Sequence, residues 1–131
     1  MMEFPNSKGV IVVIVVVIVL FILFKNKEAS EEREKPIKAI KQILEEICMK
    51  LDINVDFEVH SNFGSTFCLN KHDIYLSLRD NNGIPFNNKQ LLRNAIHEFA
   101  HIISPSEDHE EPFDQIENYL VATALELGYY V

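Results

Sequence analysis

Residues 10–24 form an uninterrupted apolar run in which every residue is Val, Ile, Leu or Phe. Lys8 precedes the run and Lys25 and Lys27 follow it, so their long side chains can extend it towards the length that crosses a bilayer. A buried strand would be shorter, and the core helix of a globular domain would need polar residues on one face. The run therefore predicts a single transmembrane helix, an anchor that we place at residues 1–25.

A cleavable signal peptide is the main alternative for this run, because signal peptides also carry an apolar segment near the N-terminus. The segment before Lys8 contains no basic side chain and is a weak n-region, and no small-x-small cleavage site follows Phe24. Both features favour an anchor that stays attached to the chain.

Basic residues are concentrated on the C-terminal side of the apolar run. Only Lys8 precedes it, whereas the basic residues that follow it most closely are Lys25, Lys27, Arg33, Lys35, Lys38 and Lys41. The positive-inside rule therefore predicts that the rest of the chain faces the cytoplasm. The chain has two cysteines and no N-glycosylation sequon, which fits a reducing compartment.

The residues after the anchor divide into a short charged segment and one domain. Residues 26–35 mix acidic and basic side chains, which predicts a solvated linker. Residues 36–131 are then enough for one compact domain with a single core. The net charge of the chain is −8 and no basic stripe occurs beyond the segment next to the anchor, so nucleic acid is not an expected partner. No feature predicts an oligomeric state.

Hydrophobic periodicity predicts that this domain is α+β. Pro36 opens a helix whose apolar residues repeat about every 3.6 positions, and the next segment alternates between apolar and polar residues as a half-buried strand does. The expected elements are a helix from residue 36, strands at residues 53–60, 66–69 and 74–78, and helices at residues 89–103 and 112–127. We expect the three strands to form an antiparallel sheet.

The helix at residues 89–103 has a cap, an uninterrupted run and one apolar face. Asn87 or Asn88 can act as its N-cap, and neither Gly nor Pro interrupts it before Pro105. The residues of its apolar face are Leu91, Leu92, Ala95, Ile96, Phe99, Ile102 and Ile103. His97 and His101 fall on the opposite side of the helix, which distinguishes them from core histidines.

His97, Glu98 and His101 form an H-E-x-x-H motif on this polar side. Two histidines four residues apart share one face of a helix, so both imidazoles can reach one Zn²⁺ ion. Glu98 lies beside such a metal, where its carboxylate can deprotonate a zinc-bound water. The alternative is a pair of ordinary surface histidines.

A catalytic zinc site has three protein ligands and one open position for water. Pro105 should end the helix, because the residue before a proline is disfavoured in the α region. His109 then lies on a short turn that can fold back towards the zinc, which makes it the predicted third ligand. The alternative ligand is a glutamate, with Glu117 a better candidate than Glu110 or Glu111.

The stretch from residue 66 to residue 113 resembles the WLM/SprT-like minimal zinc metallopeptidases, which include compact forms encoded by large DNA viruses. The residues that carry the resemblance are Thr66, Phe67, residues 74–80, residues 97–101, His109 and Phe113. The resemblance implies a small zincin-like domain in which His97, His101 and His109 bind zinc and Glu98 is the general base. It also implies that a peptide substrate lies along an edge formed by the strand at residues 74–79.

Two features depart from the pattern of that family. Glu110 follows His109, where a small residue or threonine is usual. Many SprT-like members also carry a four-cysteine zinc ribbon, which Cys48 and Cys68 alone cannot build. The role of that ribbon in DNA binding is therefore not expected here, and we interpret both cysteines as small packing groups.

The remaining histidines and the tyrosines have less specific interpretations. His60 is on the polar side of its strand and His72 is in a turn, so both are predicted to be surface residues. A tyrosine hydroxyl could stabilise the oxyanion of peptide hydrolysis, although packing is the more common role of this residue. The candidates are Tyr75, Tyr119, Tyr129 and Tyr130.

The sequence therefore predicts a membrane-tethered zinc metallopeptidase, a hydrolase in which Glu98 assists the attack of a zinc-bound water on a peptide bond. Its expected partners are a peptide or protein substrate and the membrane. The first alternative is a non-catalytic, membrane-anchored interaction module in which zinc supports a domain with too small a core. Glu98 argues against it, because a purely structural site usually closes the fourth position with a protein ligand. The second alternative is a small membrane protein in which the motif is accidental.

Overall fold

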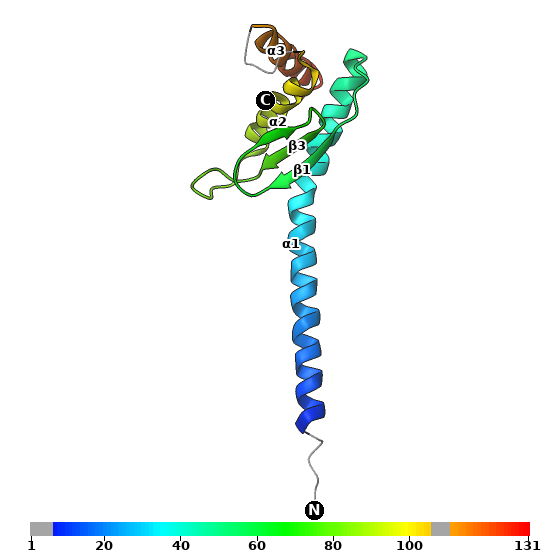
Figure 1. Ribbon diagram of the computed structural model, residues 1–131, viewed down its shortest axis with the longest axis vertical. Coiled ribbons are helices and arrows are strands. Elements are labelled where there is room, and N and C mark those ends of the chain that lie inside the picture. Colours follow the sequence, from blue (N-terminus) through cyan, green and yellow to red (C-terminus); the bar gives the residue numbers. More distant parts are fainter. Residues whose placement is uncertain (1–6, 106–110) are drawn as a thin grey trace, which may run out of the picture. The chain divides into compact units, whose positions relative to one another are not determined.

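The computed structural model describes residues 7–105 and 111–131, and within them the chain is α+β as predicted. The described residues form three helices and a three-stranded sheet. Figure 1 shows the small sheet beside the helices of the same part of the chain. The elements are α1 (Ser7–Leu51), β1 (Glu58–Asn62), β2 (Phe67–Leu69), β3 (Asp73–Ser77), α2 (Asn88–Ile103) and α3 (Glu111–Glu126). The chain divides into two units, Met1–Glu32 and Arg33–Val131.

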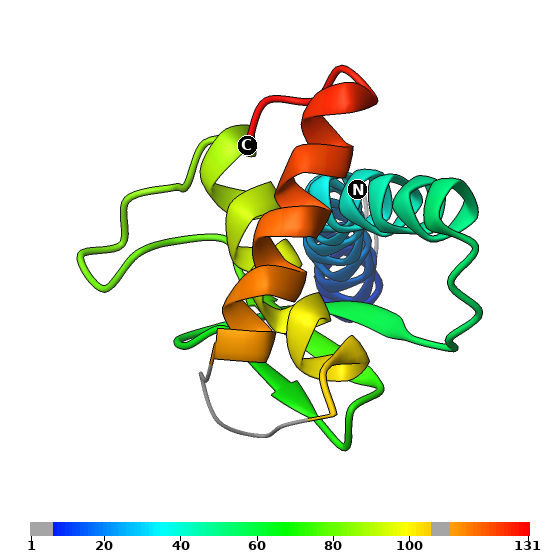
Figure 2. The ribbon, with the colours of Figure 1, turned by 90° about the horizontal axis from the view of Figure 1, so that it is seen from above.

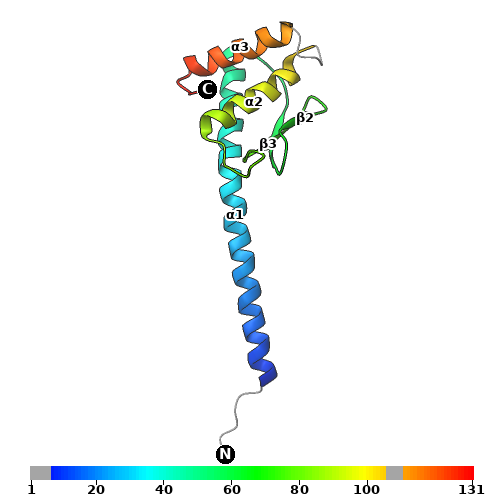
Figure 3. The ribbon, with the colours of Figure 1, turned by 90° about the vertical axis from the view of Figure 1, so that its left-hand side faces the viewer.

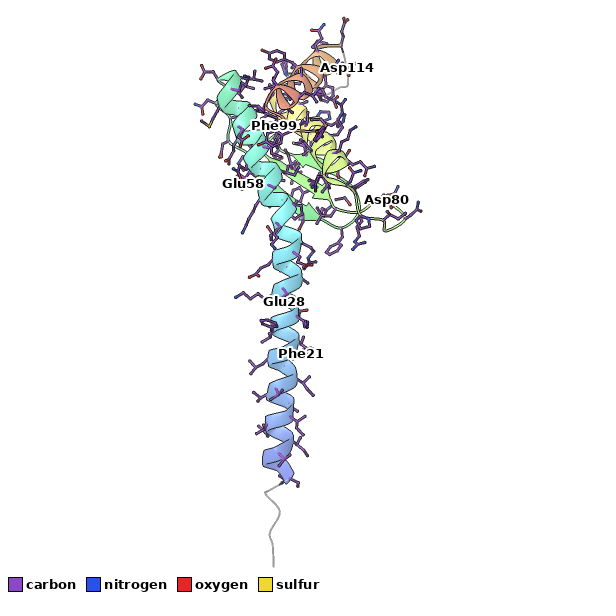
Figure 4. All side chains as sticks on the ribbon, turned by 180° about the vertical axis from the view of Figure 1, so that it is seen from behind. Phe21, Glu28, Glu58, Asp80, Phe99 and Asp114 are labelled. Atoms are coloured by element: carbon purple, nitrogen blue, oxygen red, sulfur yellow. The ribbon has the colours of Figure 1, made fainter. Side chains whose placement is uncertain are left out.

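The first unit contains the apolar part of α1. The side chains of residues 10–24 are between 44% and 62% exposed. Figure 4 shows side chains extending to both sides of this part of the helix, with Phe21 labelled. Among the described residues, α1 is the one helix that is long and apolar enough to cross a membrane. By length and composition it is a candidate membrane span or signal sequence.

Helix α1 differs from the prediction because it begins at Ser7 and contains Pro36, instead of a separate helix beginning at Pro36. The residues predicted to form a linker, 26–35, lie within α1. A proline inside a helix costs about 3 kcal/mol, because it removes one hydrogen bond and crowds the preceding turn. Strong helix formers such as Lys and Glu surround Pro36, and the side chains of Ile37 and Ile40 just after it are buried. The helix propensity of these neighbours and the burial of Ile37 and Ile40 offset the free-energy cost of Pro36.

The sheet is mixed, so the prediction of an antiparallel sheet is wrong for one of its two strand pairs. The strand order is β1-β3-β2, with β1 parallel and β2 antiparallel to β3. A tight turn at Asn70 and Lys71, both at positive φ, joins β2 to β3 as a hairpin. Strand β3 then lies between β1 and β2 and buries Ile74 and Leu76 completely. Alternating polarity locates strands along the chain but does not specify which strands are neighbours.

The core of the second unit lies among the sheet and the helices that pack on it. Ile37, Ile40, Leu44 and Ile47 are all buried, which confirms the predicted apolar stripe of this part of α1. Figures 2 and 3 show α2 between the sheet and α3. The ring of Phe99 on α2 is fully buried, with its centroid 5.1 Å from that of Phe57 before β1.

Candidate metal centre

Helix α2 carries the H-E-x-x-H motif, and its ends are set by local interactions. Asn87 is the N-cap, and its side-chain oxygen accepts a hydrogen bond from the backbone N–H of Gln90 at 2.8 Å. The Gln90 side chain accepts in return from the backbone N–H of Asn87 at 3.0 Å, which completes a capping box. Ser104 leaves the helical conformation at the other end, immediately before Pro105. The predicted helix is confirmed, with Asn87 as its cap.

The two motif histidines lie on one side of α2. The face of α2 that packs into the core contains Leu91, Leu92, Ala95, Ile96, Phe99 and Ala100. The His97 side chain is 34% exposed, and its ring centroid lies 5.2 Å from that of His101 in an edge-on arrangement. The structure therefore brings His97 and His101 together, outside the apolar core, as their spacing predicts.

Helix α3 covers this pair of histidines with one aromatic and one acidic side chain. The ring of Phe113 is buried, and its centroid lies 5.2 Å from that of His97 and 4.4 Å from that of His101. Oε1 of Glu117 lies 3.1 Å from Nδ1 of His97, and the Glu117 side chain is only 13% exposed. Arg93, one turn before His97, places Nη2 3.7 Å from the same Glu117 oxygen. Phe113 and Glu117 are four residues apart, so one face of α3 provides both contacts.

The third predicted ligand, His109, lies outside the described residues, and so does Glu110. Within residues 7–105 and 111–131, no three His, Cys, Asp or Glu side chains converge in a way that could hold a metal ion. The described part of the site thus contains His97, His101 and Glu98 from α2, with Glu117 behind His97. The complete ligand set stays a prediction.

Two adjoining cavities share Glu98 and Thr66. The larger, of about 450 Å³, is lined by Thr66, Phe67, Cys68, Asn70, Lys71, Glu98 and His101. The other, of about 290 Å³, extends from His97 and Glu98 towards Ser77, Arg79 and the loop at Asp80 and Asn81. We call the two together the β2 cleft, because β2 and the turns at its ends supply much of their lining. An extended chain in the β2 cleft would pass Glu98.

Electrostatic and hydrogen-bonding contacts shape the walls of the β2 cleft. Burial raises the pKa of the Cys68 thiol, and the nearby Glu98 carboxylate raises it further. A neutral Cys68 agrees with its interpretation as a packing group. Thr66 Oγ1 accepts a hydrogen bond from the backbone N–H of Ser77 at 2.9 Å, which holds the start of β2 against β3.

Three contributors to the site have signals that are weak in the sequence alone. Lys71 lines the β2 cleft through a turn at positive φ, and Arg93 reaches Glu117 across two helices. Glu117 was expected only as an alternative metal ligand, and its contact with Nδ1 of His97 depends on how α3 packs on α2. An i, i+4 pair of aromatic and acidic residues, here Phe113 and Glu117, is the pattern that could have indicated this contact.

The other histidines form a separate polar cluster at the start of β3. Nε2 of His60 lies 2.9 Å from one oxygen of Asp73, and Nδ1 of His72 lies 3.0 Å from the other. Nε2 of His72 also lies 3.3 Å from Asp56. The carboxylates of Asp73 and Asp56 accept hydrogen bonds from His72 and so raise its pKa, with Asp73 the larger cause. Both histidine side chains are about 40% exposed, as expected for surface residues.

The described residues that line the β2 cleft include no tyrosine. Tyr75 stacks between His60 and Phe67, with centroid distances of 4.9 Å to each. The hydroxyl of Tyr129 donates a hydrogen bond to Glu46. Tyr119 and Tyr130 are 63% and 84% exposed. These positions are typical of packing and surface residues, so none of the four is favoured as an oxyanion donor.

Comparison of the chain with protein-family models, with curated proteins and with solved structures gives no match.

Proposed function

We propose that this protein is a zinc-dependent metallopeptidase tethered to a membrane. The observation that carries the proposal is the arrangement of His97, Glu98 and His101 on one side of a capped helix that borders the β2 cleft. Two imidazoles four residues apart are a donor set suited to Zn²⁺, and His109 would complete it. Bound zinc would supply a Lewis acid that polarises the peptide carbonyl and lowers the pKa of water.

Glu98 would act as the general base. It borders both cavities of the β2 cleft, so its carboxylate is next to the space that a peptide would occupy. Glu98 would accept a proton from the attacking water and then give it to the leaving amine. A positioned general base of this kind contributes on the order of a hundredfold or more to the rate.

The proposed substrate is a peptide in extended conformation. The resemblance implies that residues 74–79 form the substrate edge, but β3 is the central strand of the sheet. Among the described strands, β2 is the one that borders the cavities and lies at an edge of the sheet. We therefore assign the substrate to the edge of β2, where backbone groups of an extended chain can add to the sheet.

The size of the core supports an enzyme over a zinc-stabilised interaction module. The module hypothesis requires a domain whose apolar core is too small without metal. The second unit buries side chains from the sheet and all three helices, with Leu44, Ile74, Phe99 and Leu120 at 1% exposure or less. Zinc would then serve chemistry rather than folding.

The anchor and the topology belong to the same proposal. The exposed apolar residues 10–24 would span the membrane, and the excess of basic residues after them would keep the catalytic unit in the cytoplasm. Protease added outside intact cells is then expected to leave the region after Lys25 intact, and its digestion would contradict this orientation.

The experiment that tests the enzymatic proposal compares Glu98→Gln with the parent in the full chain, purified in detergent. Zinc content is measured together with hydrolysis of unfolded protein substrates. We expect Glu98→Gln to retain stoichiometric zinc and its thermal transition, and to lose at least about a hundredfold in hydrolysis. Glu126→Gln, an exposed change on α3, is the control and should hydrolyse like the parent. Full activity of Glu98→Gln, or a parent that binds zinc and cleaves nothing, would reject the proposal.

A further inference from the structure

Glu117 is placed behind the first histidine of the motif. Its Oε1 lies 3.1 Å from Nδ1 of His97, and its side chain is 13% exposed. Burying a carboxylate is costly unless charged or hydrogen-bonded partners compensate it. Arg93 lies 3.7 Å away but is 44% exposed, so the imidazole of His97 is the closer and less solvated of these two partners.

The position of Glu117 distinguishes two roles that a glutamate could have here. As a metal ligand, it would converge with His97 and His101 on one point. No three described donors of this kind converge, and all three of these residues are described. A carboxylate at Nδ1 has a different use in zinc proteins, because it accepts the Nδ1–H bond and fixes the imidazole in the tautomer that binds metal through Nε2.

We infer that Glu117 is a positioning residue, which accepts a hydrogen bond from Nδ1–H of His97, directs Nε2 of that ring to the metal, and does not itself bind the metal. This inference rests on the proposed zinc site. Phe113 supports the same arrangement, since it contacts the rings of His97 and His101 from the same face of α3. Helix α3 would therefore orient the ligands that α2 presents.

The test is a measurement of zinc affinity by chelator competition on the full chain in detergent. Loss of a carboxylate that orients a metal ligand costs about 10- to 100-fold in affinity. We expect Glu117→Gln to weaken zinc binding about tenfold, because the amide oxygen can still accept the bond but has no charge. Glu117→Ala should weaken it more, and Glu126→Gln should leave it unchanged. All variants should still bind one zinc ion.

Two spectroscopic measurements separate orientation from ligation and from a purely structural effect. In the zinc-loaded parent, imidazole ¹H–¹⁵N spectra should show His97 with its proton on Nδ1, and this proton signal should shift in Glu117→Gln. The Co²⁺-substituted protein should keep the same coordination bands in Glu117→Gln. Changed coordination bands, with zinc loss as large as in His97→Ala, would make Glu117 a ligand. Unchanged zinc affinity in Glu117→Gln, or a His97 ring protonated on Nε2, would overturn the inference.

The outcomes also distinguish this inference from the proposed function. A parent that binds no zinc contradicts both. A parent that binds zinc, with variants of Glu117 that bind it equally well, contradicts only the role of Glu117. Weakened zinc binding in these variants, together with a parent that hydrolyses no peptide, upholds the positioning role and contradicts the enzymatic proposal.

Discussion

Lys71 Nζ donates a hydrogen bond to the backbone carbonyl oxygen of Ser104, and the two atoms are 2.9 Å apart. The bond joins the turn between β2 and β3 to the C-terminal end of α2. A cation is favourable there, because the last carbonyls of a helix lack partners within the helix and carry partial negative charge. Lys71 also lines the β2 cleft beside Glu98 and His101. One side chain thus contributes to both the stability and the shape of the candidate site.

Replacing Lys71 with methionine should therefore destabilise the protein. Lys71→Met keeps most of the side-chain length and removes the hydrogen bond to Ser104, which is expected to cost about 1 kcal/mol of unfolding free energy. Urea denaturation in detergent measures this change, with Lys38→Met at an exposed position of α1 as the matched control. Equal effects of the two substitutions would show that the bond to Ser104 contributes nothing specific.

The pKa of His72 should depend on Asp73 more than on Asp56. Hydrogen bonds to both carboxylates raise this pKa above the ordinary value of 6.5, with Asp73 the larger cause. Asp73→Asn should move the pKa of His72 down towards 6.5, and Asp56→Asn should move it less. Titration of the His72 ring protons by NMR measures both shifts. A larger shift in Asp56→Asn would contradict this ranking.

The cluster formed by His72 and Asp73 also determines the direction in which its contribution to the stability of the protein changes with pH. Because the folded pKa of His72 is raised, its contribution is complete below 6.5 and is lost as the pH rises through the folded value. The pKa of Asp73 is lowered below 3.8, so its contribution is present above 3.8 and is lost as the pH falls through the folded value. The cluster therefore contributes most to the stability of the folded protein between pH 3.8 and pH 6.5. Asp73→Asn should reduce the difference in stability between pH 6 and pH 9.

Local sequence signals were sufficient to predict α2 and the face that carries the motif. Asn87 and Gln90 form a capping box within four residues, and the apolar stripe follows a fixed helical period. The second and third strands were also close to those observed, whereas the first was predicted at residues 53–60 and lies at Glu58–Asn62. These features depend on neighbours in the sequence, which is why the sequence alone could indicate them.

Features that depend on tertiary packing could not be predicted in the same way. Strand β3 lies between β1 and β2 because segments distant in the sequence pair with each other. The alternating polarity of a strand does not indicate which of the other strands is its neighbour. The contact between Glu117 and His97 depends on how α3 crosses α2. Pro36 indicated the start of a helix because the free-energy cost of a proline inside a helix can be judged from the local sequence. The burial of Ile37 and Ile40, which offsets this cost, depends on tertiary packing.

His109→Ala should weaken zinc retention while the domain stays folded. Two histidines alone leave a site that exchanges its metal easily, because a catalytic zinc needs three protein ligands. Zinc dissociation into a chelator measures the effect, and His60→Ala, outside the β2 cleft, is the matched control. If His109→Ala retains zinc as tightly as the parent, another residue is the third ligand, and the positioning role inferred for Glu117 must be retested against direct ligation.

Removal of residues 1–27 should leave a soluble and folded domain. The apolar side chains of residues 10–24 are exposed and belong to the first unit, whereas the buried residues of α1 begin at Ile37. The truncated chain therefore keeps the buried residues of α1 and loses the apolar surface that would aggregate in water. Circular dichroism with a cooperative thermal transition, together with a monodisperse sedimentation profile, would support this boundary. A further truncation to residue 41 removes Ile37 and Ile40 and should lower the melting temperature sharply. Aggregation or loss of cooperativity in the chain that lacks only residues 1–27 would mean that the apolar run is part of the folded domain.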